Sequence, residues 1–183
     1  MRRILTGQTL LLICSIFYMI WWYRCYRPGE AVNRVSGLNG ILLLSTVAFG
    51  IAGVVLSLTK APVITVSKIE GIWVLAGGIA AYVLLLLITR FAFHRIVTTE
   101  LILIVGWTML EIAVICNLNA AGNLSENGFA IMCAVIAIAF IISIILYVAY
   151  YRMEEIKAFY AAMVPLVSAA LSMGTLIAVQ MLR

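Results

Sequence analysis

The sequence predicts an all-α integral membrane protein, a bundle of six transmembrane helices joined by short loops. Hydrophobic residues make up 66% of the 183 residues and charged residues only 10%, and the mean hydropathy of +1.19 lies outside the range of soluble domains. Apolar runs of about 20 residues, long enough to cross a bilayer as helices, recur six times. Lys and Arg lie almost wholly between these runs, as flanking charges of membrane helices do.

The predicted spans belong to a single membrane domain of residues 1–183. They cover residues 4–23, 40–58, 72–89, 100–117, 129–150 and 158–182. A chain of this length has room for one domain, and the six spans leave no segment long enough for a soluble domain.

The first span, residues 4–23, follows Met-Arg-Arg and so begins like a secretory signal peptide. It ends in Trp21, Trp22, Tyr23 and Arg24 rather than in the small residues of a cleavage site. Aromatic residues followed by Arg are typical of a helix leaving the bilayer. We therefore expect this segment to stay attached as a membrane helix.

The second and third spans, residues 40–58 and 72–89, contain small residues that let a neighbouring helix approach closely. We expect four glycines to lie at helix contacts rather than to face lipid: Gly50, Gly53, Gly77 and Gly78.

The fourth span, residues 100–117, carries a carboxylate, Glu111, well inside its apolar run. The segment that follows, residues 117–128, is rich in Asn and Gly and contains no Lys or Arg, so we predict a loop there.

The fifth span, residues 129–150, ends in a cluster of tyrosines before Arg152. The sixth, residues 158–182, contains Pro165, which predicts a bend because proline lacks the helical N–H. Its polar residues recur at i, i+4 and i+7 on one helical face: Ser168, Ser172 and Thr175. Such a stripe either packs helices together or lines a pocket.

The charges between spans predict the threading. If the spans alternate, seven basic residues fall on one side: Arg24, Arg27, Arg34, Arg90, Arg95, Arg152 and Lys157. Five fall on the other: Arg2, Arg3, Lys60, Lys68 and Arg183. The more basic side is expected in the cytoplasm. We therefore expect a multi-pass protein of the cell (plasma or inner) membrane with both termini outside, although Arg2 and Arg3 alone favour the opposite orientation.

Glu111 is the principal candidate for function. A carboxylate inside the apolar core costs about 2.5–3.5 kcal/mol on insertion scales, so it must face protein or water, be paired, or be protonated. Trp107 and Thr108 lie four and three residues before it, on the same helical face. No Lys or Arg occurs inside an apolar run, so we expect support from hydroxyls such as that of Tyr82.

The candidate ligand-binding residues are therefore Glu111, Trp107, Thr108, Tyr82, Ser168, Ser172 and Thr175. They describe a site for a small solute, a cation, an amine or a proton in the outer half of the bundle. The competing interpretation is that Glu111 is a protonated or hydrogen-bonded carboxyl that holds helices together.

Several classes of function have no support in the sequence. The net charge of +5 lies on short connectors, not on a basic face with interleaved aromatics, so we expect no nucleic-acid partner. The single histidine, His94, cannot supply two axial ligands for haem, and Asp is absent. No hydrolase or metalloprotease motif occurs. We expect no catalytic residues, no metal site, no cofactor and no enzymatic activity.

In outline, six spans in about 180 residues with a polar outer loop resemble the substrate-binding subunits of vitamin transporters. The resemblance is one of size and hydropathy, and it implies a solute-binding role without carrying over any residue. The preferred hypothesis is a small transport or solute-binding protein whose site surrounds Glu111. The alternative is a structural or regulatory subunit that packs in the bilayer against a partner membrane protein or a second copy of itself.

Overall fold

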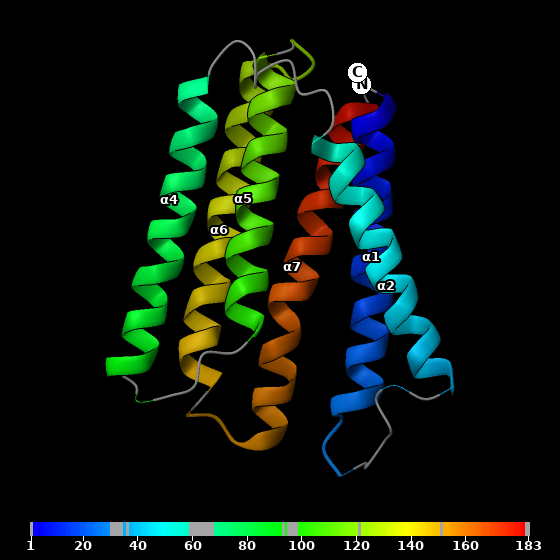
Figure 1. The fold of residues 1–183 in the computed structure, drawn as a ribbon, viewed down its shortest axis with the longest axis vertical. Coiled ribbons are helices and arrows are strands. Elements are labelled where there is room, and N and C mark those ends of the chain that lie inside the picture. The colour runs from blue at the N-terminus through cyan, green and yellow to red at the C-terminus, as the bar shows by residue number, and fades with distance from the viewer. Residues whose placement is uncertain are drawn as a thin grey trace. The chain divides into compact units, whose positions relative to one another are not determined.

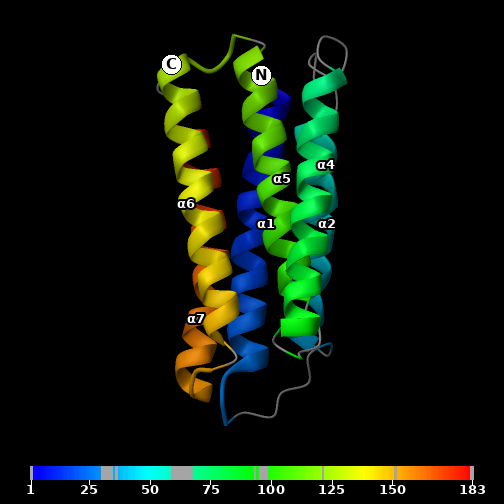
Figure 2. The ribbon, with the colours of Figure 1, turned by 90° about the vertical axis from the view of Figure 1, so that its left-hand side faces the viewer.

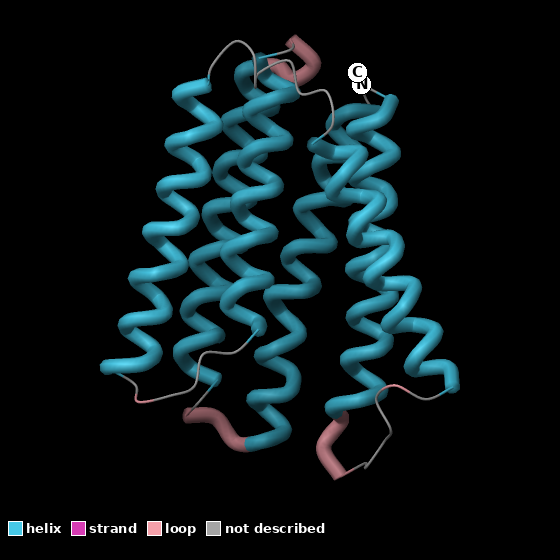
Figure 3. The backbone as a smooth tube through the Cα atoms, in the orientation of Figure 1, coloured by secondary structure: helices cyan, strands magenta, loops and turns pink. Residues whose placement is uncertain are grey.

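The computed structural model of the protein describes residues 2–29, 35, 37–58, 68–92, 94, 99–120, 122–150 and 152–181. Within these residues the regular structure is helical throughout, as the trace in Figure 3 shows. In chain order the elements are α1 (Arg2–Tyr26), α2 (Gly37–Leu58), α4 (Lys68–Leu87), the π-helical η1 (Ile88–Ala92), α5 (Thr99–Ala120), α6 (Glu126–Tyr150) and α7 (Glu155–Met181). The all-α prediction is therefore confirmed for the described residues.

Each predicted span overlaps one of these α-helices, and the third also extends into η1. Five of the described helices, α1, α2, α5, α6 and α7, are long and apolar enough to cross a membrane. The remaining helix, α4, has 20 residues and leads directly into the five residues of η1. Where its side chains are described, the apolar stretch of this helix is Gly77–Ala92.

The connection between α5 and α6 differs from the prediction. We predicted a loop over residues 117–128, and this is wrong at both ends, because α5 runs on to Ala120 and α6 begins at Glu126. Gly122 ends α5 with a φ of 66°, and the N–H of Asn123 donates to the Leu118 carbonyl at 2.8 Å. This is the wide hydrogen bond of a Schellman cap, for which glycine is the preferred residue.

The start of α6 is capped as well. Ser125 precedes the helix, and its Oγ accepts a hydrogen bond of 3.1 Å from the N–H of Gly128. A serine in this position satisfies one of the N–H groups that a helix start leaves without a helical partner. Gly122 and Ser125, which suggested a long loop, are helix caps instead.

By their contacts the helices fall into two compact units. The first comprises Met1–Thr59 and Ile141–Arg183, and the second comprises Lys60–Phe140. The first unit holds α1, α2, α7 and the last part of α6, and the second holds α4, η1, α5 and the first part of α6. A single domain of residues 1–183 stays a prediction.

In the first unit, α1 and α2 form an antiparallel hairpin with very close backbones (Figure 1). A Cβ built on Gly7 would lie 2.7 Å from the Ser57 nitrogen and 2.9 Å from the Gly53 oxygen. One built on Gly53 would lie 2.7 Å from Leu11 Cγ, and Gly50 also faces α1. The absence of side chains lets the helices approach to this distance. The prediction that Gly50 and Gly53 lie at a helix contact is confirmed.

The other partner of α1 is α7. Near the end of α1, the Trp22 and Phe159 rings stack with centroids 4.8 Å apart, and Trp21 is buried in the same cluster. Two turns closer to the start of α1, Ser15 Oγ donates to the Leu166 carbonyl of α7 at 3.5 Å. Figure 1 shows the start of α1 and the end of α7 at the same end of this unit, as an antiparallel pair requires.

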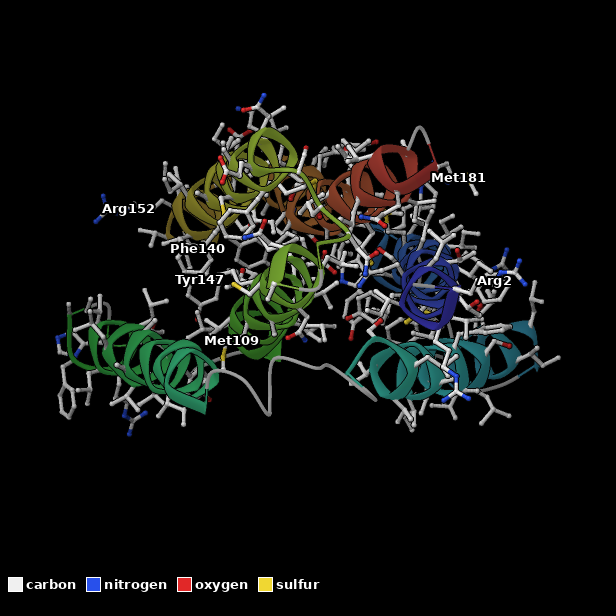
Figure 4. The ribbon with its side chains drawn as sticks, turned by 90° about the horizontal axis from the view of Figure 1, so that it is seen from above. Arg2, Met109, Phe140, Tyr147, Arg152 and Met181 are labelled. Carbon is white, nitrogen blue, oxygen red and sulfur yellow. The ribbon has the colours of Figure 1, made fainter. Side chains whose placement is uncertain are left out.

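In the second unit, α4 and α6 run antiparallel to α5 (Figures 1 and 2). Met109 projects from α5 toward α4 (Figure 4), where a Cβ on Gly78 would collide with its Sδ. The prediction for Gly78 is thus confirmed. For Gly77 it is wrong, because Gly77 is exposed and nothing in the described structure lies within 4 Å of a Cβ built there. Consecutive helical residues point about 100° apart, so a glycine pair cannot place both members at one contact.

The outward faces of several helices are apolar. Large exposed side chains recur at helical spacing on α2, α6 and α7: Ile41, Leu44, Ile51 and Val55; Ile131, Ile138, Ile141 and Ile145; Val164, Val167 and Leu171. Water-soluble proteins rarely expose apolar surface so continuously, whereas lipid chains solvate it well. These faces fit a lipid environment.

Candidate functional site

The seven residues predicted to bind a ligand are divided between the two units. The second unit holds Glu111, Trp107 and Thr108 on α5 and Tyr82 on α4. The first unit holds Ser168, Ser172 and Thr175 on α7. A pocket shared by all seven residues stays a prediction.

One face of α5 is buried along almost its whole length. The buried residues on this face follow one another at three- or four-residue spacing: Leu101, Ile104, Thr108, Glu111, Ile115 and Leu118. Glu111 is 0% exposed, and both of its carboxyl oxygens are inaccessible to solvent. The sequence predicts that this carboxyl faces protein rather than lipid, and its burial agrees with that.

Glu111 is also far from both ends of its helix. It is twelve residues from Thr99 and nine from Ala120 along α5, which corresponds to about 18 Å and about 13 Å at 1.5 Å per residue. Among the described buried side chains on this face of α5, Glu111 carries the ionisable group and the others are apolar or carry a hydroxyl.

Thr108 and Trp107 lie one turn before Glu111. The Thr108 hydroxyl donates to the Ile104 carbonyl at 2.8 Å, so its proton is used within α5. Trp107 is half-buried, and its indole Nε1 is buried with no hydrogen-bond acceptor in the described part of the chain. The indole is therefore a donor that the described residues do not satisfy.

Tyr82 is half-buried on α4 and lies at a different level from Glu111. Gly78 faces Met109, and because the two helices are antiparallel, Tyr82 lies about 6 Å from that level in one direction and Glu111 about 3 Å in the other. The axial separation is therefore about 9 Å. A role for Tyr82 in the Glu111 site stays a prediction.

The hydroxyls of α7 bond to the backbone of their own helix. Ser168 donates to the Pro165 carbonyl at 2.9 Å, Ser172 to the Ala169 carbonyl at 2.9 Å, and Thr175 to the Leu171 carbonyl at 2.8 Å. Such back-bonding satisfies a hydroxyl locally and often bends the helix. It leaves each oxygen able to accept one more hydrogen bond, but uses the proton that a hydroxyl would donate to a ligand.

Sequence reasoning missed a buried polar pair in the first unit. Gln8 on α1 is 1% exposed, and its Nε2 donates to Ser57 Oγ on α2 at 3.5 Å. Polar residues inside two consecutive apolar runs were the available signal. Pairing them requires the register of the hairpin, in which Gly7 faces Gly53 and Ser57.

In the part of the chain that the structure describes, no group of three or more His, Cys, Asp or Glu side chains could hold a metal ion. The candidate site therefore consists of the buried carboxyl of Glu111 and, one helix turn away on α5, the ring of Trp107 with its unsatisfied indole N–H. Comparisons with protein-family models, curated proteins and solved structures found no match to this chain.

Proposed function

We propose that this chain is a six-span integral membrane protein that binds and transports a small solute or cation at a site around Glu111. The membrane assignment is supported by five helices of sufficient length and apolarity and by the continuous apolar outer faces of α2, α6 and α7. The sixth span is α4 with η1, whose 20 and five residues together have the required length.

The observation that carries the solute site is the complete burial of Glu111 deep within α5. Desolvation disfavours a carboxylate strongly, and ionisable groups inside membrane spans usually mark substrate or ion pathways. Glu111 supplies the anionic group that a cation needs, and Trp107 supplies a wall one turn away. We propose a binding role for these residues and no catalytic one.

We place the protein in the cell membrane with both termini outside. The support is the excess of basic residues on the connectors after the first, third and fifth spans. A cysteine at Ser125, in a background lacking the native cysteines, is expected to react with an impermeant maleimide in intact cells. Reaction only after lysis would reverse the threading.

A structural or regulatory subunit is the second candidate, and one observation favours it. Gly77 and Ala80 lie exposed on α4, with open space beside Gly77. Small exposed residues of this kind allow another helix to approach closely. In that case Glu111 is a packing carboxyl, and no solute binds there.

Ligand-induced thermal stabilisation separates the two candidates. Wild type and Glu111→Gln, in the same detergent, are melted with a panel of inorganic cations, amines and neutral solutes. Glu126→Gln, which removes an exposed carboxylate from the first turn of α6, is the matched control. We expect at least one cationic compound to raise the Tm of wild type and of the control but not of Glu111→Gln. Identical responses of all three proteins would leave the subunit function in the lead.

A further inference from the structure

The end of α1 carries an exposed arginine whose direction is fixed by a buried side chain. Arg24 Nε donates to Asn39 Oδ1 of α2 at 3.1 Å. Asn39 is only 5% exposed, so the amide that holds the guanidinium is itself held by the packing of the helices. Within the described residues this bond is the one hydrogen bond of the Arg24 side chain. Its two terminal nitrogens therefore still have their N–H groups to donate.

An exposed apolar stripe runs along α1 to this arginine. Ile16, Ile20 and Tyr23 are 42%, 44% and 38% exposed and follow one another at four- and three-residue spacing. Arg24 lies four residues after Ile20, so it continues the same face. Arg2 lies about five full turns before Ile20 on that face, and Figure 4 shows it pointing outward from α1. In a membrane this stripe therefore faces lipid.

The length of the stripe matches one leaflet of a bilayer. From Ile16 to Arg24 the helix rises about 12 Å, at 1.5 Å per residue. The hydrocarbon core is about 30 Å thick, so one leaflet contributes about 15 Å. With Arg24 among the headgroups, Ile16 lies close to the bilayer centre, and Tyr23 lies at the interface, where tyrosine is enriched. One acyl chain can thus lie along the stripe while its headgroup contacts Arg24.

The charges at this end of the first unit favour an anionic headgroup. The Arg27 guanidinium lies 5.9 Å from the centroid of the Tyr23 ring. At the start of α7, Lys157 pairs with Glu154 at 2.9 Å. The exposed charges that the structure describes here are four basic side chains and two carboxylates: Arg24, Arg27, Arg152, Lys157, Glu154 and Glu155. A guanidinium matches the geometry of a phosphate, and the excess of positive charge disfavours a headgroup that also carries an ammonium.

We propose that the end of α1 binds an anionic phospholipid, with the phosphate on the terminal nitrogens of Arg24 and one acyl chain along Ile20 and Ile16. The proposed threading puts this end of α1 in the cytoplasmic leaflet, which carries anionic lipid. The lipid site requires that α1 cross the membrane, but it needs no solute at Glu111. It therefore goes beyond the proposed function, and its failure would leave the Glu111 site unaffected.

Lipid selection by the full-length protein tests the site. The protein is assembled in nanodiscs that contain equal amounts of phosphatidylglycerol and phosphatidylcholine with the same acyl chains, and native mass spectrometry counts the lipids that stay bound after release. We expect wild type to retain phosphatidylglycerol about fivefold over phosphatidylcholine, the factor that one basic side chain provides near anionic headgroups. Equal retention would overturn the proposal, and this comparison needs no variant to fold.

Inorganic phosphate separates a lipid from a free anion. Excess phosphate in the buffer should leave the retention ratio unchanged, because phosphate has no acyl chain to lie along Ile16 and Ile20. A preference for phosphatidylglycerol that disappears in phosphate but not in chloride of the same ionic strength would assign Arg24 to a free anion and overturn the lipid site.

Three variants assign the preference to its residue. Arg24→Gln should lower the retention ratio at least about threefold. Arg2→Gln removes the same charge from the same face at the other end of α1, so it is the matched control and should keep the wild-type ratio. Arg24→Lys keeps the charge, but one ammonium cannot hold Asn39 and a phosphate as a guanidinium does, so the ratio should fall at least about twofold. A ratio that changes equally or not at all in Arg24→Gln and Arg2→Gln, or that is unchanged in Arg24→Lys, would mean that diffuse charge selects the lipid and would overturn the site at Arg24.

Discussion

Two helix contacts of this protein, one in each unit, are built in different ways. In the first unit, α1 and α2 touch backbone to backbone through Gly7 and Gly53, with the oxygen of one glycine within 3.0 Å of a Cβ built on the other. In the second unit, α4 and α5 are held apart by a side chain, since Met109 of α5 fills the place that a side chain at Gly78 would take. One contact is rigid, and the other depends on a flexible thioether.

The polar groups near the two contacts also differ, since they link the helices at the first contact but not at the second. Gln8 reaches across the α1–α2 contact to Ser57, so the polar group links the two helices. On α5 the nearest hydroxyl bonds to its own backbone, and the indole donor of Trp107 has no acceptor in the described structure. Tight packing with mutual hydrogen bonds serves stability, whereas a looser contact beside an unsatisfied donor and a buried carboxyl suits a site that accepts a ligand.

The largest loss of stability is expected from a substitution that disrupts the α1–α2 contact. Gly53→Leu should destabilise the protein by about 3 kcal/mol, the upper end of ordinary overpacking, because both Leu11 and the Gly7 backbone obstruct the new side chain. Gly77→Leu is the matched control, since no described residue lies within 4 Å of a Cβ built on Gly77, and should change stability by less than about 0.5 kcal/mol. Chemical denaturation in mixed micelles measures both. Equal losses would contradict the assignment of these glycines to different environments.

The flexible contact should respond more weakly. Gly78→Ala places a methyl group against Met109, whose side chain can turn away, so we expect a loss of about 1 kcal/mol. In a Met109→Ala background the same substitution should cost almost nothing. A double-mutant cycle measures the coupling, and additive losses would show that Met109 is not the obstacle.

The polar link in the hairpin should contribute less again. Ser57→Ala removes the acceptor of the Gln8 amide, and hydrogen bonds between membrane helices average about 0.6 kcal/mol. Thermal unfolding of Ser57→Ala and of Gln8→Leu,Ser57→Ala should show that the pair can be replaced at little cost. A loss above about 2 kcal/mol for the double variant would mean that Gln8 makes further interactions essential to the fold.

The smallest effect concerns the hydroxyl stripe of α7. Ser172 is fully buried but bonds to the Ala169 carbonyl of its own helix, so Ser172→Ala should change stability by less than about 0.5 kcal/mol. Solute affinity should be unchanged, because its proton is already used within α7. A loss of affinity of tenfold or more would support the prediction that Ser172 lines the binding site.

The positions of the helices could be predicted from the sequence because apolar runs of membrane length leave few alternatives. Their ends could not, since Gly122 and Ser125 read equally well as loop residues and as caps until the hydrogen bonds to Leu118 and Gly128 are known. Which glycine of α4 contacts α5 could not be predicted from the sequence either. Gly77 and Gly78 are identical residues, and only the direction of α5 decides which of them is covered.

Part of the candidate site was predictable for the same reason. The cost of a carboxylate in lipid requires that Glu111 face inward, and the buried face of α5 contains it. The bonding of Thr108 to Ile104 and the lack of an acceptor at Trp107 Nε1 depend on side-chain rotamers, which no spacing rule supplies. The Gln8–Ser57 pair depends on the register of two helices and was missed.

Chemical modification of Glu111 tests the central claim most directly. A hydrophobic carbodiimide enters the bilayer and modifies buried protonated carboxyls, and peptide mass spectrometry locates the adduct. We expect Glu111 to be modified in the full-length protein in nanodiscs, and at least one compound of the cation and amine panel to slow that reaction at least about tenfold while leaving modification of the exposed Glu126 unchanged. Modification of Glu111 at the same rate with and without every compound of the cation and amine panel would contradict its role as the solute-binding group.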